Sequence, residues 1–236
     1  MDIRKSVAVV TGANRGLGRC LVDELLNQGA GKLYALARDP STLRKDARVV
    51  PVAFDLLDAE AIAAAAIVAG DATLLINNAS TAMFATPLEA DPAAVHAELA
   101  VNFEGLYNMI RAFVPVIEAN GGGQIVNLLS LLSLASTPSM AGYSASKAAA
   151  HSLTQALRPG LAIKSITVHG VYPGGIDTDM LAGIDAPKTA PEEVATRILR
   201  SLADDVEDIF PDPNSQAMSE IWWSDPKAFE RAFSGV

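Results

Sequence analysis

Two side chains that could exchange a proton lie four residues apart in GYSASKAAA (142–150). Tyr143 and Lys147 stand in a run of small residues, and the alanines and leucines that follow are typical of a helix. Residues i and i+4 share one face of a helix, so the phenol and the ammonium would be neighbours. An ammonium lowers the pKa of a nearby phenol from about 10, which makes a tyrosine usable as an acid or base. Alone, the spacing also fits a half-buried tyrosine beside a solvated lysine.

A glycine-rich turn near the N-terminus could hold a phosphate. VAVVT (7–11) is a short apolar run typical of a strand buried on both faces, and TGANRGLG (11–18) follows it. Gly12, Gly16 and Gly18 would let backbone amides approach a pyrophosphate, and a helix beginning there would direct its positive end toward it. The spacing is GxxxGxG instead of the commoner GxGxxG. Between a buried strand and an amphipathic helix, this turn predicts a dinucleotide site.

Residues after the second and third strands could recognise the adenosine half of a dinucleotide. A carboxylate after the second strand would bind the ribose 2′-OH of NAD, but the chain has ALARDP, with the cationic Arg38. Arg15 could converge on the same spot, and two guanidiniums suit the 2′-phosphate of NADP. Asp39 competes, because it could turn inward to the 2′-OH. Asp55 could accept from the adenine amino group or share a helix cap with Asp58.

Strands and helices alternate along the whole chain. Expected strands are 7–11, 32–37, 49–54, 72–77, 121–130, 164–173 and 206–211; expected helices are 17–30, 58–70, 92–118, 143–157, 191–203 and 225–233. Pro159 is expected to end the 143–157 helix. The connection 38–48 has room for a single helical turn. The order predicts an α/β fold: one Rossmann-type domain over 1–236, a doubly wound parallel sheet of about seven strands with helices on both faces.

Composition excludes several classes of protein. Half of the 236 residues are hydrophobic and 19% are charged, which argues against disorder, and a net charge of −9 argues against a broad nucleic-acid or anionic-membrane surface. The single cysteine, Cys20, allows no intramolecular disulfide, as in a reducing cytoplasm. The longest apolar run, 61–69, is half the roughly 18 residues of a membrane span, so we expect a cytoplasmic protein. No cysteine or histidine cluster has metal-ligand spacing, so no catalytic metal is expected.

Taken together, the motifs resemble those of the short-chain dehydrogenase/reductase family over roughly residues 5–210. After TGANRGLG come, in order, NNAS (77–80), Asn102, Ser130, YSASK (143–147) and PGGIDT (173–178). The resemblance implies an NADP(H)-dependent oxidoreductase that transfers a hydride between nicotinamide and a ketone or secondary alcohol. It also implies a homodimer or homotetramer that pairs through the long helices 92–118 and 143–157.

The resemblance implies a role for each catalytic residue. Tyr143 would be the general acid in reduction and the general base in oxidation. Lys147 would lower the pKa of Tyr143 and bind the nicotinamide ribose, and Asn102 would hold a water that links Lys147 to solvent. Ser130 would hydrogen-bond the substrate oxygen; Ser133 is the competing serine of LLSLLS, and the spacing to Tyr143 favours Ser130. Two hydroxyl groups aimed at one carbonyl oxygen would stabilise its developing negative charge, and the cofactor would supply the hydride.

The same resemblance implies a set of cofactor-binding residues. Asn77 and Ala79 would form the wall beside the adenine ribose, and Thr178 and the Ile176 backbone would place the carboxamide. The whole set is Gly12, Asn14, Arg15, Gly16, Leu17, Gly18, Arg38, Asp55, Leu56, Asn78, Ala79, Tyr143, Lys147, Pro173, Gly174, Ile176 and Thr178.

Two departures from the family pattern concern the substrate end. Ser80 replaces the usual glycine after NNA, a small change that should not block the cofactor. Segment 179–190, which covers the substrate in the family, is short, so we expect an open pocket that tolerates bulky ketones. Trp222 and Trp223 could close this pocket or pack at a subunit interface. Candidates for its lining, each of which could equally be core, are Met83, Phe84, Met140, Met180 and Leu181.

Three functions compete. The leading one is an NADPH-dependent carbonyl reductase or alcohol dehydrogenase acting on a small-molecule ketone or alcohol. The second is a 3-oxoacyl reductase acting on CoA-linked or carrier-protein-linked chains, although an acidic carrier protein would need a basic patch on this acidic chain. The third is a non-catalytic NADP-binding sensor, which would not need Tyr143, Lys147, Ser130 and Asn102 together. His169 is expected to be a hydrogen-bonded core histidine.

Overall fold

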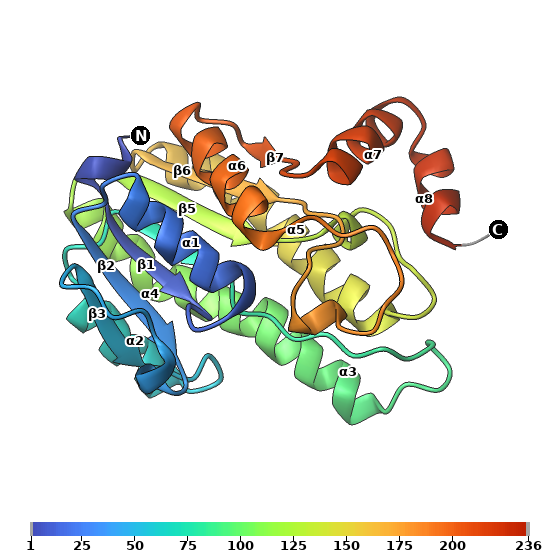
Figure 1. Cartoon of the computed structure of the whole chain (residues 1–236), viewed down its shortest axis with the longest axis horizontal. Helices are drawn as coiled ribbons and strands as arrows, with labels where there is room; N and C mark the ends of the chain where they lie inside the picture. The colour runs from blue at the N-terminus through green and yellow to red at the C-terminus, as the bar shows by residue number, and fades with distance from the viewer. Residues whose placement is uncertain (1, 235–236) are drawn as a thin grey trace.

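A parallel sheet of seven strands forms the centre of the molecule (Figure 1). The computed structural model describes residues 2–234, so residues 1, 235 and 236 of the expected domain lie outside the described residues. The strands are β1 Val7–Thr11, β2 Lys32–Ala37, β3 Val49–Ala53, β4 Leu74–Asn77, β5 Gly123–Leu128, β6 Ile166–Val171 and β7 Asp208–Ile209. Their order is β3-β2-β1-β4-β5-β6-β7, and every neighbouring pair is parallel. The expected doubly wound fold is confirmed.

Helices cover both faces of this sheet (Figure 1). One face packs against α1 Gly16–Asn27 and α6 Pro191–Ala203, through buried leucines and isoleucines such as Leu21 and Ile198. The other face packs against α2 Ala59–Val68, α4 Leu106–Ala119 and α5 Ala141–Ala162, through side chains such as Phe113. Each large apolar side chain buried in this way contributes about 1.5–3 kcal/mol. The two cores fix the helices that carry the chemistry described below.

The long helix expected at 92–118 is interrupted. It consists of α3 Pro92–Leu99, a π-type turn η3 Ala100–Gly105, and then α4. A π-type turn adds a residue to the helical turn, and such turns often mark functional sites. Asn102 lies within it.

The helix expected at 143–157 is longer than predicted, because Pro159 does not end it and α5 continues to Ala162. Proline removes a hydrogen bond to the carbonyl of the residue four positions earlier, here Gln155. Gln155 and Pro159 are both exposed, so water can satisfy that carbonyl and the helix continues. The expected turn in the connection 38–48 is present as η2 Pro40–Thr42.

The C-terminal region holds a helix that the sequence analysis missed, α7 Pro213–Ser224, ahead of the expected terminal helix, α8 Pro226–Ser234. Asp212 caps α7: its carboxylate accepts from the Ser215 N–H at 2.8 Å, and Pro213 occupies the first turn. Asp-Pro followed by serine is a helix-start signal that was present in the sequence. In Figure 1, α7 and α8 lie at the end of the sheet toward which the arrows of β5 and β7 point.

The strand order reverses between β1 and β4, which makes the carboxyl ends of the strands the expected ligand-binding edge. Short one-turn helices η4 Leu131–Ser133 and η5 Asp179–Leu181 follow β5 and β6 at this edge, and η1 Ile3–Lys5 precedes β1. No helix among residues 2–234 is long and apolar enough to cross a membrane.

Candidate active site

A cavity of about 820 Å³ extends along the carboxyl ends of the strands. Its walls come from the turn after β1, the ends of β2 and β3, the segment after β4, η4, the first turns of α5 and the segment after β6. Ligand pockets typically measure about 300–1,000 Å³, so the size of this cavity is that of a ligand-binding site.

The turn after β1 has the backbone geometry of a phosphate cradle. Gly12 and Gly16 have φ of 64° and 51°, a region that favours glycine. A Cβ on Gly18 would lie 2.1 Å from the Gly12 carbonyl oxygen, so only glycine fits there. The amide of Asn78 donates to the carbonyl of Thr11 at 2.9 Å and thereby ties the turn to the end of β4. The residues present therefore fit a pyrophosphate at the N-terminus of α1.

Every residue of the expected cofactor-binding set lies along this cavity. Asn77, which was expected in the ribose wall, does not: it is buried, and its amide donates to Asn127 at 2.9 Å. Asn78 and Ala79 form that part of the wall instead. The prediction for Asn77 is wrong because Asn77 is the last residue of β4 and its side chain is used inside the sheet, whereas the cavity begins at the residues that follow the strand.

At the adenosine end, Arg38 lines the cavity, whereas Asp39 accepts from the backbone and hydroxyl of Ser41 at 2.9 and 2.7 Å. Asp39 therefore holds the turn η2 and does not face the cavity. Arg15 also lines the cavity but pairs with Asp179 at 3.0 Å, so the expected convergence of two arginines is not present in this structure.

Asp55 and Asp58 follow β3, and the sequence left open whether Asp55 faces a ligand or shares the cap of the next helix with Asp58. Asp58 alone caps α2, accepting from the N–H groups of Glu60 and Ala61. Asp55 accepts from the Leu57 N–H at 3.0 Å and lines the cavity. The cap is therefore not shared, and Asp55 is placed where it can meet a ligand.

Tyr143 and Lys147 lie in the first two turns of α5 and are both buried, with 8% and 4% of their surface exposed. The Lys147 Nζ lies 5.7 Å from the centre of the tyrosine ring and donates to the Leu128 carbonyl at 2.6 Å. Burial lowers the pKa of Lys147 to about 7 and raises the pKa of Tyr143 to about 12. The expected lowering of the Tyr143 pKa is therefore wrong for this structure, because removal from water raises it more than the neighbouring hydroxyl groups lower it.

Ser130 stands beside the phenol at the end of β5. Its Oγ accepts from the Leu132 N–H at 3.1 Å, and the nearby Ser130 hydroxyl lowers the pKa of Tyr143, against the effect of burial. Ser133, the competing serine, donates to the Ser130 carbonyl within its own turn and does not line the cavity. The geometry therefore favours Ser130 as the serine that meets a substrate oxygen.

The Asn102 side chain joins the π-type turn to the segment after β4 and to α5 through hydrogen bonds. Its Oδ1 accepts from Ser80 Oγ and from the Thr81 N–H, each at 2.9 Å. Its Nδ2 donates to the Thr81 carbonyl at 2.8 Å and to Ser146 Oγ at 2.9 Å. An asparagine amide has two donor and two acceptor positions, so the side chain is fully occupied. The expected water beside Asn102 would thus have to bind the backbone of the π-type turn, and that role stays a prediction.

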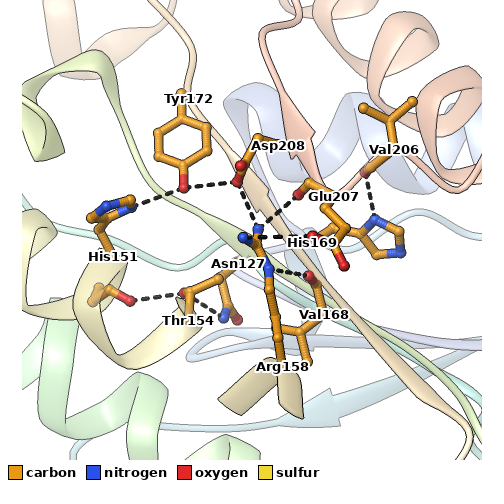
Figure 2. A network of polar contacts seen from close by, with 11 residues as sticks. Asn127, His151, Thr154, Arg158, Val168, His169, Tyr172, Val206, Glu207 and Asp208 are labelled. Atoms are coloured by element: carbon orange, nitrogen blue, oxygen red, sulfur yellow. Dashed lines mark hydrogen bonds and ion pairs between the residues drawn. The ribbon is translucent and has the colours of Figure 1, made fainter. Parts of the chain in front are cut away.

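Buried polar contacts fix α5 against the sheet (Figure 2). Asn127 on β5 donates to the Thr154 hydroxyl at 2.9 Å, and Thr154 donates to a backbone carbonyl of its own helix at 2.8 Å. The His151 ring lies 2.9 Å from the Tyr172 hydroxyl, which donates to Asp208 at 3.1 Å. These contacts hold the helix that carries Tyr143.

The far end of α5 is held by Arg158, which pairs with Asp208 at 2.6 Å and donates to the Val168 carbonyl at 3.2 Å (Figure 2). His169 is fully buried, with its Nδ1 2.7 Å from the Val206 carbonyl, and burial lowers its pKa. The prediction of a hydrogen-bonded core histidine is confirmed.

The substrate end of the cavity is mostly apolar. Of the expected lining residues, Phe84, Met140, Met180 and Leu181 are present, whereas Met83 is 49% exposed and lies outside the lining. The short segment 179–190 contributes to one wall through Met180 and Leu181.

The C-terminal helices reach the cavity through residues that the sequence analysis did not name. Asn214 of α7 and Phe233 of α8 line it, and the cap residue Asp212 accepts from the Gly174 N–H at 2.9 Å. Trp222 and Trp223 do not line it: their rings pack on each other at 4.4 Å, and Trp223 is 65% exposed. The Asp-Pro helix-start signal before Asn214 could have placed α7 here.

No group of three or more histidine, cysteine, aspartate or glutamate side chains within residues 2–234 is arranged to hold a metal ion. The arrangement that is present is a buried phenol, a buried amine and a hydroxyl at one end of a cavity whose other end is a phosphate cradle. That combination can bind a dinucleotide and move a proton to or from a small molecule beside it.

Comparison with known proteins agrees with this description. The family model "short chain dehydrogenase" matches residues 6–189, so the chain belongs to the short-chain dehydrogenase family of oxidoreductases. The crystal structure of a short chain dehydrogenase from Burkholderia cenocepacia in complex with NADP has a TM-score of 0.94 and 41% identity, covering 99% of each chain.

Two curated relatives are similar over most of the chain. An uncharacterised oxidoreductase of Staphylococcus saprophyticus is 30% identical over 218 residues, 86% of this chain and 93% of the relative. Galactitol 2-dehydrogenase (L-tagatose-forming) of Cereibacter sphaeroides is 35% identical over 184 residues, 73% of this chain and 72% of the relative.

Proposed function

We propose that the protein is an NADP(H)-dependent dehydrogenase/reductase that interconverts a ketone and a secondary alcohol, of the carbonyl reductase or alcohol dehydrogenase type. The observation that carries the proposal is the placement of Tyr143, Lys147 and Ser130 at one end of the cavity that begins at the glycine-rich turn. In this proposal Tyr143, Lys147, Ser130 and Asn102 form the catalytic set.

NADPH bound in the cavity would supply the hydride. Tyr143 holds a proton at neutral pH, since its pKa is raised to about 12, and can give it to a carbonyl oxygen that is gaining electrons. Ser130 donates a second hydrogen bond to the same oxygen. Lys147, in its charged form, favours the phenolate that remains after proton transfer.

Three observations support NADP(H) over NAD(H). Arg38 lines the cavity after β2, where a 2′-phosphate would lie, and Asp39 is occupied with Ser41. Arg15 lines the same cavity as Arg38, and its exposed ion pair with Asp179, of a kind that contributes only about 0–1 kcal/mol, leaves it available to a 2′-phosphate. The Burkholderia cenocepacia relative, 41% identical, holds NADP.

The cavity favours a neutral, largely apolar ketone. Its basic side chains, Arg15, Arg38 and Lys147, all belong to the expected cofactor set, and the rest of the substrate end is mainly apolar, including Phe84 and Phe233. Nothing in the lining supplies the basic patch that a carrier-linked 3-oxoacyl chain would need. The short segment 179–190 supports a pocket that accepts bulky ketones.

We further propose a homodimer or homotetramer that pairs through the helical stretch from α3 to α4 and through α5, as the family resemblance implies, in a cytoplasmic protein with neither a nucleic-acid nor a membrane partner. Mass measurement by light scattering tests the assembly. A monomer at micromolar concentration would overturn that part of the proposal.

The test is an NADPH-oxidation assay over small, aromatic and bulky ketones, diketones, steroids and a 3-oxoacyl thioester. We expect turnover on several apolar ketones and none with Tyr143→Phe, which should still bind NADPH. Activity confined to the thioester would favour the 3-oxoacyl function, and NADPH binding without turnover on any compound would favour the sensor.

A further inference from the structure

Ser80 brings an additional hydroxyl group into the active site. It follows β4, it is half-buried, and it lines the same cavity as Tyr143. Its Oγ donates to Asn102 Oδ1 at 2.9 Å. In the family that this chain resembles, a glycine usually occupies the position, so no side chain would be there to make this contact.

The Ser80 hydroxyl is linked to the turn of α5 that carries the tyrosine. The Asn102 amide that accepts from Ser80 also donates to Ser146 Oγ at 2.9 Å. Ser146 Oγ in turn donates to the backbone carbonyl of Tyr143 at 2.7 Å. A chain of three hydrogen bonds therefore fixes Ser80 relative to Tyr143.

Ser80, Ser130 and Tyr143 line the same cavity, and both serine hydroxyl groups act on the Tyr143 phenol. Both contacts lower the pKa of Tyr143, whereas burial and the charge of Glu98 raise it. Ser130 comes from the end of β5 and Ser80 from the end of β4, so the two hydroxyl groups belong to neighbouring strands of the sheet.

We propose that Ser80 is a further catalytic residue of this site, whose hydroxyl stabilises the phenolate form of Tyr143 together with Ser130. The inference rests on the proposed function. Ser80 has a single hydroxyl hydrogen, which lies on Asn102 while the phenol keeps its proton. When Tyr143 has given its proton to the substrate oxygen, that hydrogen turns to the phenolate, and Asn102 Oδ1 keeps its second donor, the Thr81 N–H.

The decisive variants are Ser80→Ala and Ser80→Gly, the second of which restores the usual family residue. In alcohol oxidation Tyr143 must be deprotonated, so the rate rises with pH through its pKa. Loss of a donor to the phenolate should move the midpoint of the kcat profile upward by about half to one pH unit, with kcat at neutral pH falling about 3–10-fold. The KM for NADP should stay within about twofold. Ser80→Thr, which keeps a hydroxyl, should restore the midpoint.

The matched control is Ser144→Ala. Ser144 is also a buried serine and adjoins Tyr143 in the chain, but its hydroxyl donates to the Met140 carbonyl and it does not line the cavity. Its variant should leave the midpoint unchanged. A midpoint that stays in place in both Ser80 variants, while Ser130→Ala moves it, would overturn the proposal.

A second measurement does not depend on turnover. The phenolate absorbance of Tyr143 in the NADP-bound protein is obtained by subtracting the titration of Tyr143→Phe from that of the wild type. Ser80→Ala should displace this titration to higher pH, and Ser144→Ala should not. If no ketone in the panel is reduced, the proposed function fails, and this titration still decides the role of Ser80.

Discussion

The carboxylate of Glu98 and the amide of Asn102 lie one helical turn apart and hold the same segment of the active-site wall. Glu98 accepts from the Met83 N–H at 2.7 Å, and Asn102 accepts from the Thr81 N–H at 2.9 Å. Residues four apart share one face of a helix, so one face spanning α3 and η3 positions residues 80–83. Glu98 is also buried, and its charge raises the pKa of Tyr143.

Glu98→Gln should shift the pH profile in the direction opposite to Ser80→Ala. Glutamine keeps an oxygen that can accept from Met83 but removes the negative charge near Tyr143. The pKa of the phenol should fall, and the midpoint of kcat for alcohol oxidation should move downward by several tenths of a unit to about one unit. The measurement is kcat against pH with saturating NADP and alcohol.

Glu104→Gln is the control for this prediction, because Glu104 lies in the π-type turn η3 that follows α3 but is exposed. It removes the same charge from a position open to solvent, where screening is strong. An equal shift in both variants would show that Glu98 acts only through the net charge of the protein.

Lys147→Met should stabilise the cofactor-free protein while it abolishes turnover. Burial lowers the pKa of Lys147 from 10.5 in the unfolded chain to about 7 in the folded protein. Between these values the unfolded state binds a proton that the folded state does not, so wild-type stability rises with pH across this window. The cost of burying the lysine is fully present below pH 7 and is lost above 10.5.

The thermal midpoint of Lys147→Met should therefore exceed that of the wild type by roughly 2–4 °C at pH near 6, and the difference should shrink toward pH 10. Lys164→Met is the control, since Lys164 forms an ion pair with Glu118 at the surface. A gain that is constant from pH 6 to about 10 would mean that the amine is not the cause.

Those parts of the site that depend on local spacing could be predicted from the sequence. Tyr143 and Lys147 share a helix face because they are four apart, and the glycine-rich turn lies where a strand meets a helix. Apart from Tyr143 and Lys147 on α5, the expected cofactor residues reach the cavity because their motifs follow strand ends, and strand ends of a parallel sheet meet at one edge.

Features that depend on tertiary packing could not be predicted in this way. The pKa of Tyr143 follows from its burial, which spacing does not reveal. Asn77 and Asn78 are adjacent and chemically identical, yet Asn77 ends β4 and bonds to Asn127, whereas Asn78 follows the strand and bonds to the glycine-rich turn. Phe233 meets the cavity because α7 and α8 lie at the end of the sheet where the strands finish.

Thr154→Val should destabilise the protein and loosen the helix that carries Tyr143. Valine has the shape of threonine but cannot accept from Asn127, whose amide would be left buried without its partner. The expected cost is about 1–3 kcal/mol, and each kcal/mol lowers the thermal midpoint by roughly 2–4 °C in a protein of this size. Calorimetry measures the change.

Thr196→Val is the control for that loss. Thr196 also donates to a backbone carbonyl of its own helix, that of Glu192, but on an exposed face of α6. The same substitution should therefore change the midpoint by less than about 2 °C. Equal losses in the two variants would show that the effect comes from the helix itself and not from the contact with Asn127.

Arg38→Ala should weaken the binding of NADPH and leave the binding of NADH nearly unchanged. A guanidinium bound to a phosphate makes charge-assisted hydrogen bonds of about 1.5–3 kcal/mol, so the KM for NADPH should rise roughly 10–100-fold. NADH has no 2′-phosphate, and its KM should change by less than about threefold. Arg44→Ala is the control, because Arg44 pairs with Asp23 and does not line the cavity. A KM that rises equally for both cofactors would mean that Arg38 contacts a part of the dinucleotide that they share, and the preference for NADP would then rest on Arg15.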